Sequence, residues 1–208
     1  MVTWQRGNAA ARARGSARRT LGPNNTIRTA VIGTNGRGLA HVECLTSLPG
    51  VEVAYICDVD DRAIATGIKT TTKQQKTEPK GLKDFRKALE DPALDAVTIA
   101  SPDHWHAPMA ILALAAGKHV YLEKPCSHNP YEGELLIQAV RKHQRVLQMG
   151  NQRRSFPNMQ QAVREIHSGI IGRAYFGRAW YANRRAAIGR GKAAPVPAWL
   201  DFDLLQGP

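Results

Sequence analysis

The sequence predicts an α/β protein in which helices cover both faces of a doubly wound, parallel β-sheet. An apolar strand ending in Ala30, Val31 and Ile32 runs directly into a glycine-rich turn, Gly33–Gly38. A second apolar strand, Val51–Cys57, ends at Asp58. Beyond it, short apolar strands alternate with helical patterns, as a parallel sheet with crossover helices requires.

Hydrophobic spacing, turn residues and capping residues place the remaining elements. Gly117 and Gly169 are expected to end helices, and Asn129, Pro130 and Glu132 to open one with a capping box. The expected helices are 37–48, Leu82–Glu90, Ala107–Ala116, the one opened by Asn129 and one holding Met159, Val163 and Ile166; the expected strands are Ala96–Ala100, His119–Leu122 and Arg145–Met149.

Composition indicates a globular, intracellular chain. Of its 208 residues, 43% are hydrophobic and 22% charged, which is ordinary globular content. Cys44, Cys57 and Cys126 include no C-x-x-C pair, so neither a disulfide framework nor a thiolate zinc site is indicated. The apolar run Ala107–Ala116 is too short to span a bilayer. We expect a cytoplasmic protein without a membrane partner.

The formal net charge of +12 is concentrated in residues 1–42 and 151–192, while the rest is close to neutral. We expect residues 1–25 to form a disordered basic arm because they have no periodic apolar face. Arg18 and Arg19 leave twin-arginine export of a longer form open. The basic segments also suggest a nucleic-acid-binding protein, but they lack an aromatic RNA-binding pattern, zinc-ligand spacing and a recognition helix. We therefore expect no nucleic-acid partner.

The turn between the first strand and the following helix has the features of a phosphate-binding turn. Gly33 permits positive φ, and Gly38 lets the helix pack closely on the strand. The backbone N–H groups of the helix start carry the positive end of its dipole, so a pyrophosphate is the natural occupant. The middle glycine of G-x-G-x-x-G is replaced by Asn35, a residue that tolerates left-handed geometry.

Asp58 strengthens this interpretation. A carboxylate at the end of the second strand is placed to bond the adenosine ribose hydroxyls of a dinucleotide. It would repel a 2′-phosphate, so NAD is expected as the cofactor and NADP less so. Read alone, Asp58 with Asp60 and Asp61 is also compatible with a solvated loop.

Polar or conformationally special residues follow every expected strand. Because ligands of parallel sheets collect at the carboxyl ends of the strands, we expect these segments to form one site. The candidate cofactor-binding residues are Gly33, Thr34, Asn35, Gly36, Arg37, Gly38, Asp58, Ser101, Pro102, His104, His106, Glu123 and Lys124.

The motifs GTNGRG, CDVD, SPDHWHA, LEKP and GNQRR, in this order, resemble the N-terminal half of the Gfo/Idh/MocA oxidoreductases, from about Thr26 to Pro208. The resemblance implies a Rossmann fold over residues 26–150. It also implies that residues 151–208 begin an α+β second domain that is incomplete, with a first strand over Ala174–Asn183. Lys124 then lies beside the nicotinamide and the reacting hydroxyl, and Ser101, Pro102, His104 and His106 line the cofactor cleft.

Lys124 also has a chemical rationale as the catalytic residue. Hydride removal from a secondary alcohol leaves negative charge on oxygen, which a fixed ammonium stabilises. Partial burial would lower the pKa of the amine and let it share protons. Pro125 would aim Lys124, and Glu123 would orient Lys124 or the cofactor. The alternative is an ordinary surface lysine.

The remaining polar candidates leave alternatives open. His104 and His106 are expected at a helix start, one imidazole near the cofactor; no third ligand supports a metal site, so none is expected. Arg153 and Arg154 are either contacts for an anionic or hydroxyl-rich substrate or a solvated edge. Cys126 is either redox-sensitive or a small buried thiol.

The expected function is NAD-dependent hydride transfer to or from a hydroxyl-bearing carbon of a sugar, polyol or cyclitol. The resemblance leaves an NAD-using glycoside hydrolase as the alternative. It also implies a homo-oligomer for the full-length form. The chain resembles a fragment, so we expect weak NAD binding, little or no turnover, and exposed aromatic residues around Tyr175, Phe176, Trp180 and Tyr181.

Overall fold

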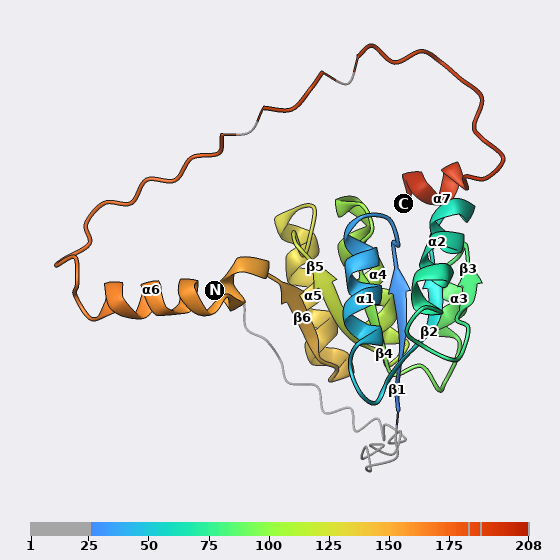
Figure 1. Cartoon of the computed structure of the whole chain (residues 1–208), viewed down its shortest axis with the longest axis horizontal. Coiled ribbons are helices and arrows are strands. Elements are labelled where there is room, and N and C mark those ends of the chain that lie inside the picture. The colour runs from blue at the N-terminus through green and yellow to red at the C-terminus, as the bar shows by residue number, and fades with distance from the viewer. Residues whose placement is uncertain (1–25, 183, 188, 208) are drawn as a thin grey trace, which may run out of the picture.

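The computed structural model describes residues 26–182, 184–187 and 189–207. The sheet contains β1 (Ile27–Ile32), β2 (Val51–Cys57), β3 (Lys80–Leu82), β4 (Ala96–Ile99), β5 (His119–Glu123) and β6 (Leu147–Gly150). These strands are all parallel and lie in the order β3-β2-β1-β4-β5-β6. The predicted doubly wound fold is confirmed, and strand order reverses between β1 and β4 (Figure 1).

Helices cover both faces of the sheet (Figure 1). The described helices of the Rossmann part are α1 (Arg37–Thr46), α2 (Asp61–Thr71), α3 (Arg86–Leu89), α4 (Asp103–Ala115) and α5 (Pro130–His143). One core cluster joins Val31 of β1 to α1 and α2, and the other joins Ala30 and Ile32 to α3, α4 and α5. This division follows from the alternation of side chains along a strand, which sends neighbouring residues to opposite faces.

Local sequence signals account for the start of α5 and the end of α4. The side chain of Asn129 accepts a hydrogen bond from the Glu132 amide at 3.0 Å, as expected of an N-cap. The Glu132 carboxylate accepts from the amide of His128, one residue earlier than a capping box requires. Gly117 follows α4 with φ of 79°, the left-handed conformation that closes a helix.

The structure differs from the predicted secondary structure in the region after Asp58. The expected helix Leu82–Glu90 is in part wrong, because Leu82 ends the short edge strand β3 and α3 begins only at Arg86. The helix α2 was not predicted; its N-cap Asp60 accepts a hydrogen bond from the Arg62 amide at 2.8 Å. A three-residue edge strand carries little periodic signal, whereas α2 does carry a helical one, since Ala63, Gly67 and Thr71 are buried at four-residue spacing.

Unlike the Rossmann part, the described residues between 151 and 198 are all exposed. The 3₁₀-helix η1 (Gln152–Ser155) and α6 (Pro157–His167) are exposed, and the chain then runs outward as a long coil before returning at α7 (Phe202–Gln206) (Figure 1). The strand expected over Ala174–Asn183 is not formed: residues 174–182 have no sheet partner among the described residues, and Asn183 lies outside them. A strand pairs its backbone with that of a neighbouring strand, and the described residues supply no such neighbour for this exposed segment.

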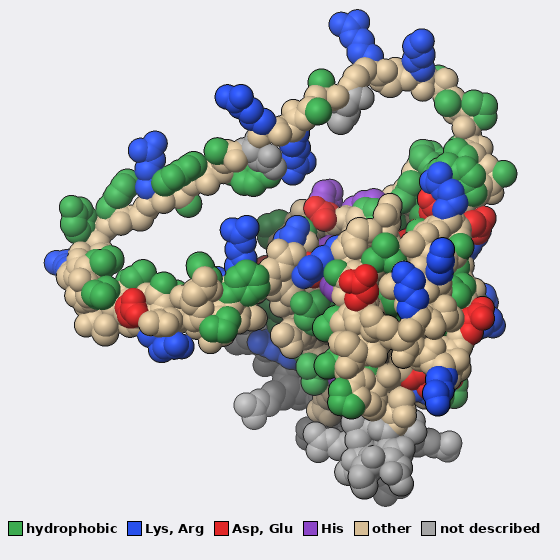
Figure 2. Space-filling view, viewed as in Figure 1, with side chains coloured by type: hydrophobic (Ala, Val, Ile, Leu, Met, Phe, Trp, Pro, Cys, Tyr) green, Lys and Arg blue, Asp and Glu red, His purple; other side chains and the backbone are tan. Residues whose placement is uncertain are grey.

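Hydrophobic and basic side chains lie along this coil, and few other residues cover them (Figure 2). The expected exposure of aromatic residues is observed, since Tyr175 is 92% exposed and Phe176, Trp180 and Tyr181 are also exposed. The expected basic arm, residues 1–25, lies outside the described residues.

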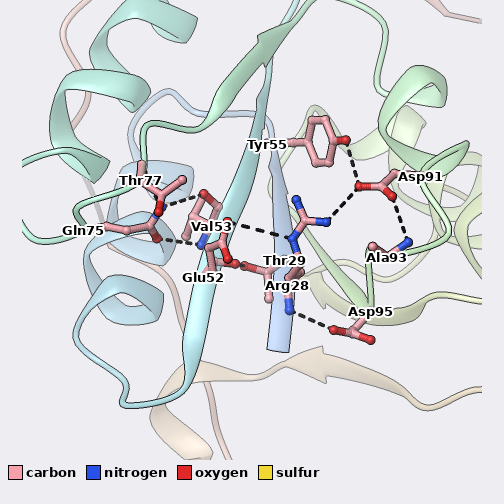
Figure 3. Close-up of polar contacts among 10 residues, drawn as sticks. All are labelled: Arg28, Thr29, Glu52, Val53, Tyr55, Gln75, Thr77, Asp91, Ala93 and Asp95. Carbon is pink, nitrogen blue, oxygen red and sulfur yellow. Dashed lines mark hydrogen bonds and ion pairs between the residues drawn. The ribbon is translucent and has the colours of Figure 1, made fainter. Parts of the chain in front are cut away.

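The amino-terminal ends of β1 and β4 carry a network of polar contacts (Figure 3). Asp91 accepts hydrogen bonds from the Tyr55 hydroxyl at 2.9 Å, Arg28 Nη1 at 3.2 Å and the Ala93 amide at 2.8 Å. Asp95 accepts from the Arg28 amide at 2.9 Å. These groups satisfy one another, so this edge of the sheet is fastened by its own side chains.

Candidate active site at the carboxyl edge of the sheet

The glycine turn after β1 approaches its neighbours too closely for side chains. Gly33 has φ of 80°, and a Cβ there would lie 2.7 Å from the backbone of Ala100. A Cβ on Gly38 would lie 1.7 Å from the carbonyl oxygen of Gly33, which explains how α1 packs against the strand end. Gly36, with φ of 53°, supplies the second left-handed residue; Asn35 does not.

The first turn of α1 has no side-chain cap on its backbone donors from the described residues, and of these donors the Gly38 amide donates to the carbonyl oxygen of Asn35 at 3.2 Å. Gly36 is the N-cap. The first turn also holds no acidic residue. The initial amides of a helix have no partner within the helix, and the helix dipole makes their surroundings positive. This turn fits the pyrophosphate of a dinucleotide, whose charged oxygens would accept from these amides.

Asp58 is connected to the same turn. Its Oδ2 accepts hydrogen bonds from the Thr34 amide at 2.7 Å and from the Thr34 hydroxyl at 3.3 Å. Its Oδ1 accepts from the Asp60 amide at 3.0 Å. Thr34 is fully buried, so the two residues fix the relative positions of the β1 and β2 ends. A carboxylate has about four lone-pair sites, which leaves Asp58 capacity for a ligand hydroxyl.

A cleft of about 470 Å³ opens between the ends of β1, β2 and β4. Five of the predicted residues line it: Gly33, Asn35, Asp58, Ser101 and Pro102. Most of its other lining is apolar and includes Phe85, Trp105 and Met109. The cleft therefore combines a mainly apolar interior with two carboxylates, Asp58 and Asp60, at one end, which suits a flat heterocycle attached to a hydroxyl-bearing sugar.

Glu123, at the end of β5, is buried and paired. Its Oε1 accepts from Arg37 Nε at 2.8 Å and lies 3.0 Å from His41 Nε2. Burial alone would raise the pKa of Glu123, but the hydrogen bonds from Arg37 and His41 together hold that pKa below its ordinary value. Glu123 thus ties β5 to the start of α1; the contacts of its side chain are with Arg37 and His41 rather than with the amine of Lys124.

Lys124 follows at the same edge of the sheet as the glycine turn, because Arg37 beside that turn pairs with the adjacent Glu123. The Lys124–Pro125 peptide bond is cis, and both residues are exposed. The partial burial expected of Lys124 is therefore not observed. The rationale that remains for Lys124 as the catalytic residue is its positive charge at the accessible end of β5.

The two histidines of the β4 loop contact backbone carbonyls. His106 is 1% exposed, and its ring nitrogens face the carbonyl oxygens of Ser101, at 2.9 Å, and of Pro125. It therefore connects the loops after β4 and β5. His104 Nε2 donates to the carbonyl oxygen of Leu205 at 3.0 Å. Neither ring lines the cleft.

Arg153 and Arg154 lie in η1, directly after β6, and both are exposed. Cys126 is partly buried and packs against the larger core cluster, whereas Cys57 is buried and its desolvation raises the pKa of the thiol to about 12. Among the described residues, no group of three or more His, Cys, Asp or Glu side chains could hold a metal ion. None of the described helices is long and apolar enough to cross a bilayer.

The sequence analysis missed several residues around the cleft. Arg62 lies over the ring of Trp199, with 3.3 Å from its Cζ to the ring centroid, and pairs with Asp60 at 2.7 Å. Lys83 and Phe85 contribute from the β3–α3 region. The motif after β2, D-V-D-D-R, was a local signal for the Asp60–Arg62 pair. Nothing local in the sequence indicates that Trp199 returns to this edge.

A parallel sheet with a glycine turn, an uncapped helix start and a carboxylate after β2 defines a dinucleotide-binding Rossmann protein. Comparison with family models agrees: residues 27–151 match the model described as "Oxidoreductase family, NAD-binding Rossmann fold", named GFO_IDH_MocA. This match covers more than half of the chain, which therefore belongs to this family and confirms the resemblance found in the motifs.

Relatives by sequence include both oxidoreductases and glycosyl hydrolases. The chain is 34% identical over 146 residues to an uncharacterised oxidoreductase of Bacillus subtilis, covering 70% of this chain and 41% of that protein. It is 30% identical over 163 residues to a glycosyl hydrolase family 109 protein of Saccharopolyspora erythraea, covering 76% and 35%. The chain thus spans between a third and a half of the length of these relatives.

Solved structures give the same assignment. A putative oxidoreductase from Klebsiella pneumoniae is 32% identical with a TM-score of 0.59, covering 72% of this chain and 41% of that one. The myo-inositol dehydrogenase of Lactobacillus casei, in complex with NAD(H) and myo-inositol, is 28% identical with a TM-score of 0.63, covering 71% and 43%.

Proposed function

We propose that this chain carries the NAD-binding part of an oxidoreductase that transfers hydride between nicotinamide and a hydroxyl-bearing carbon of a sugar, polyol or cyclitol. One observation supports it above the others: the glycine turn, Asp58 and the Lys124 loop all open at the same edge of the sheet. The similarity to a myo-inositol dehydrogenase supports a polyol substrate.

Each part of the edge has a role in this proposal. The amides of the turn and of the first turn of α1 bind the pyrophosphate. Asp58 accepts from the ribose hydroxyls and, by charge repulsion, disfavours a 2′-phosphate. The nicotinamide supplies the hydride chemistry when NAD is bound. Lys124 places a positive charge beside the substrate oxygen, where it stabilises the charge left on that oxygen.

Glu123 and His106 act as positioning residues. Glu123 binds Arg37 and so holds the β5 end against the start of α1. His106 holds the loops after β4 and β5 at a fixed separation. Lys124 lies between these two attachments in the sequence, which restricts where its backbone can move.

Calorimetric titration with NAD and with NADP tests the proposal. We expect NAD to bind at least about tenfold more tightly than NADP, because a 2′-phosphate beside the Asp58 carboxylate is repelled. The substitution Asp58→Asn should narrow that ratio, since it removes the charge but keeps an acceptor. Absence of NAD binding would contradict the proposal, and tighter binding of NADP would contradict the role of Asp58.

An NAD-using glycoside hydrolase is the second candidate, favoured by the 30% identity to a family 109 glycosyl hydrolase. Both activities would use the same NAD site. A dehydrogenase accumulates NADH in proportion to product, whereas a hydrolase that re-reduces its intermediate releases sugar with no net NADH. Following absorbance of NADH and release of free sugar together, in the longest natural form of the protein, separates the two.

A further inference from the structure

The cleft has a wall that lies outside the family-matched residues. Trp199, Leu200, Leu204 and Leu205 line it from the C-terminal segment, defined here as residues 199–207. The family model ends at residue 151, and the described residues between 152 and 198 are all exposed. Figure 1 shows the chain leaving the Rossmann part after β6 and returning beside α2 at α7.

Backbone hydrogen bonds attach the start of this segment to the loop after β2. The Asp61 amide donates to the carbonyl oxygen of Trp199 at 3.0 Å. The Asp201 amide donates to the carbonyl oxygen of Val59 at 2.9 Å, and Asp60 and Leu200 form an antiparallel bridge. The segment therefore pairs with the residues that immediately follow Asp58.

A second attachment joins the end of the segment to the start of α4. Trp105 Nε1 donates to the carbonyl oxygen of Leu204 at 2.9 Å, and His104 Nε2 donates to that of Leu205 at 3.0 Å. Leu204 also packs against the larger core cluster, which includes Phe85 and Trp105. The segment thus spans the cleft from the β2 side to the β4 side.

On this wall, Arg62 and Trp199 hold each other in position. The Arg62 guanidinium stacks on the Trp199 ring and pairs with Asp60, so its fork is held on both sides. A stacked, paired arginine is less available to a phosphate than a free one. Trp199 and Leu200 add apolar surface to the cleft on the side of Asp60 and Arg62, and this surface suits an adenine ring more than an additional phosphate.

We propose that the C-terminal segment forms one wall of the adenosine pocket, so that the adenosine half of the coenzyme is held between residues 58–62 and residues 199–205. This rests on the proposed function, and it adds a binding element that the family-matched domain does not contain. The segment acts on the adenosine half only, because Lys124 lies at the end of β5, outside the cleft.

Titrations of AMP, ADP-ribose and NAD into two variants test this wall. Trp199→Ala removes the ring beside Arg62 and is expected to weaken all three ligands about tenfold, equivalent to about 1.4 kcal/mol. Gly207→Ala alters no residue lining the cleft, but its Cβ would lie 2.8 Å from Trp105 Nε1 at φ of +80°. It should displace the segment and weaken the same ligands.

Gly189→Ala is the matched control, since Gly189 has φ of +78° with no atom within 4 Å of its Cβ position. It should leave all three affinities unchanged. Hydrogen exchange of residues 199–206 verifies that Gly207→Ala releases the segment while the Rossmann amides stay protected.

The outcomes separate this proposal from the proposed function. Binding of NAD that Trp199→Ala and Gly207→Ala leave unchanged, or strengthen, overturns the wall and keeps the NAD site. Wild-type binding of AMP and ADP-ribose without NAD, lost in both variants, keeps the wall and overturns the dehydrogenase. A wild type that binds none of the three ligands overturns both.

Discussion

The two edges of the central sheet use polar residues in opposite ways. At the amino-terminal edge, the Asp91 carboxylate accepts hydrogen bonds from Tyr55, Arg28 and the Ala93 amide, so each of these polar groups has a partner (Figure 3). At the carboxyl edge, the Thr34 amide donates to Asp58, but no described side chain caps the backbone donors at the start of α1. A cleft of about 470 Å³ opens beside them.

This difference indicates at which edge of the sheet polar groups are left for ligand binding at the expense of folding stability. The same strands supply both edges, so the sheet itself requires neither arrangement. Groups that satisfy one another contribute to folding, whereas donors left at an open edge contribute only when a ligand arrives. Substitutions at the amino-terminal edge should therefore change folding alone, whereas substitutions at the carboxyl edge should change ligand binding as well.

The largest expected contrast is between two glycines with positive φ. Gly33→Ala, at the carboxyl edge, places a Cβ 2.7 Å from the Ala100 backbone and should cost more than about 4 kcal/mol of unfolding free energy. Gly50→Ala, just before β2, meets no atom within 4 Å and should cost about 1 kcal/mol from left-handed strain alone. Urea unfolding of both variants measures this, and equal losses would contradict the close approach.

The next contrast exchanges one carboxylate for an amide at each edge. Asp91→Asn should cost about 2 kcal/mol of stability, because charged hydrogen bonds are lost, and leave NAD affinity unchanged. Asp58→Asn should weaken NAD about tenfold, since the ribose contact is made by a neutral amide oxygen instead of a charged one. If Asp91→Asn lowers the NAD affinity although the variant is fully folded, the distinction between the two edges is wrong.

The smallest expected effect is a pH dependence of stability at both edges. The hydrogen bond from Ala93 lowers the pKa of Asp91 below its ordinary value, with Tyr55 and Arg28 adding to the effect. The pKa of Glu123 is also lowered, because its bonds to Arg37 and His41 outweigh burial. A lowered folded-state pKa gives stability that is present above the ordinary pKa and lost as pH falls through the folded value.

Unfolding at pH 7 and pH 3 checks this sign. Wild type should lose stability on acidification below about pH 4.5, where unfolded carboxyl groups begin to protonate. The stability gap between wild type and either Asp91→Asn or Glu123→Gln should narrow at pH 3. A gap of constant size at both pH values would show that neither carboxylate is ionised and paired in the folded state.

Much of the Rossmann part was predictable because its signals are local. The apolar runs of β2 and β5, the left-handed Gly117 and the N-cap Asn129 all depend on a few neighbouring residues. The helix α4 was expected to begin at Ala107 but begins at Asp103, because the small apolar residues that mark the rest of the helix are absent from its first turn. The edge strand β3 was missed because three residues carry no usable period.

The candidate site was predicted only in part. Residues that follow strands were placed at the carboxyl edge by topology alone, as for Asp58 and Ser101. The pairing of Glu123 with Arg37 and His41 joins elements that lie 82 to 86 residues apart, which no local pattern reports. The position of Trp199 also depends on tertiary docking. The strand expected over 174–183 required a neighbour that the described chain does not supply.

The most direct test of the carboxyl-edge site is a backbone amide NMR titration of the chain with NAD. The account predicts shift changes at Gly33–Gly38, at Asp58–Asp60 and at Ser101, with none at Gly50 or at Ala93–Asp95 on the opposite edge. Shift changes confined to the amino-terminal edge, or their absence at saturating NAD, would contradict it.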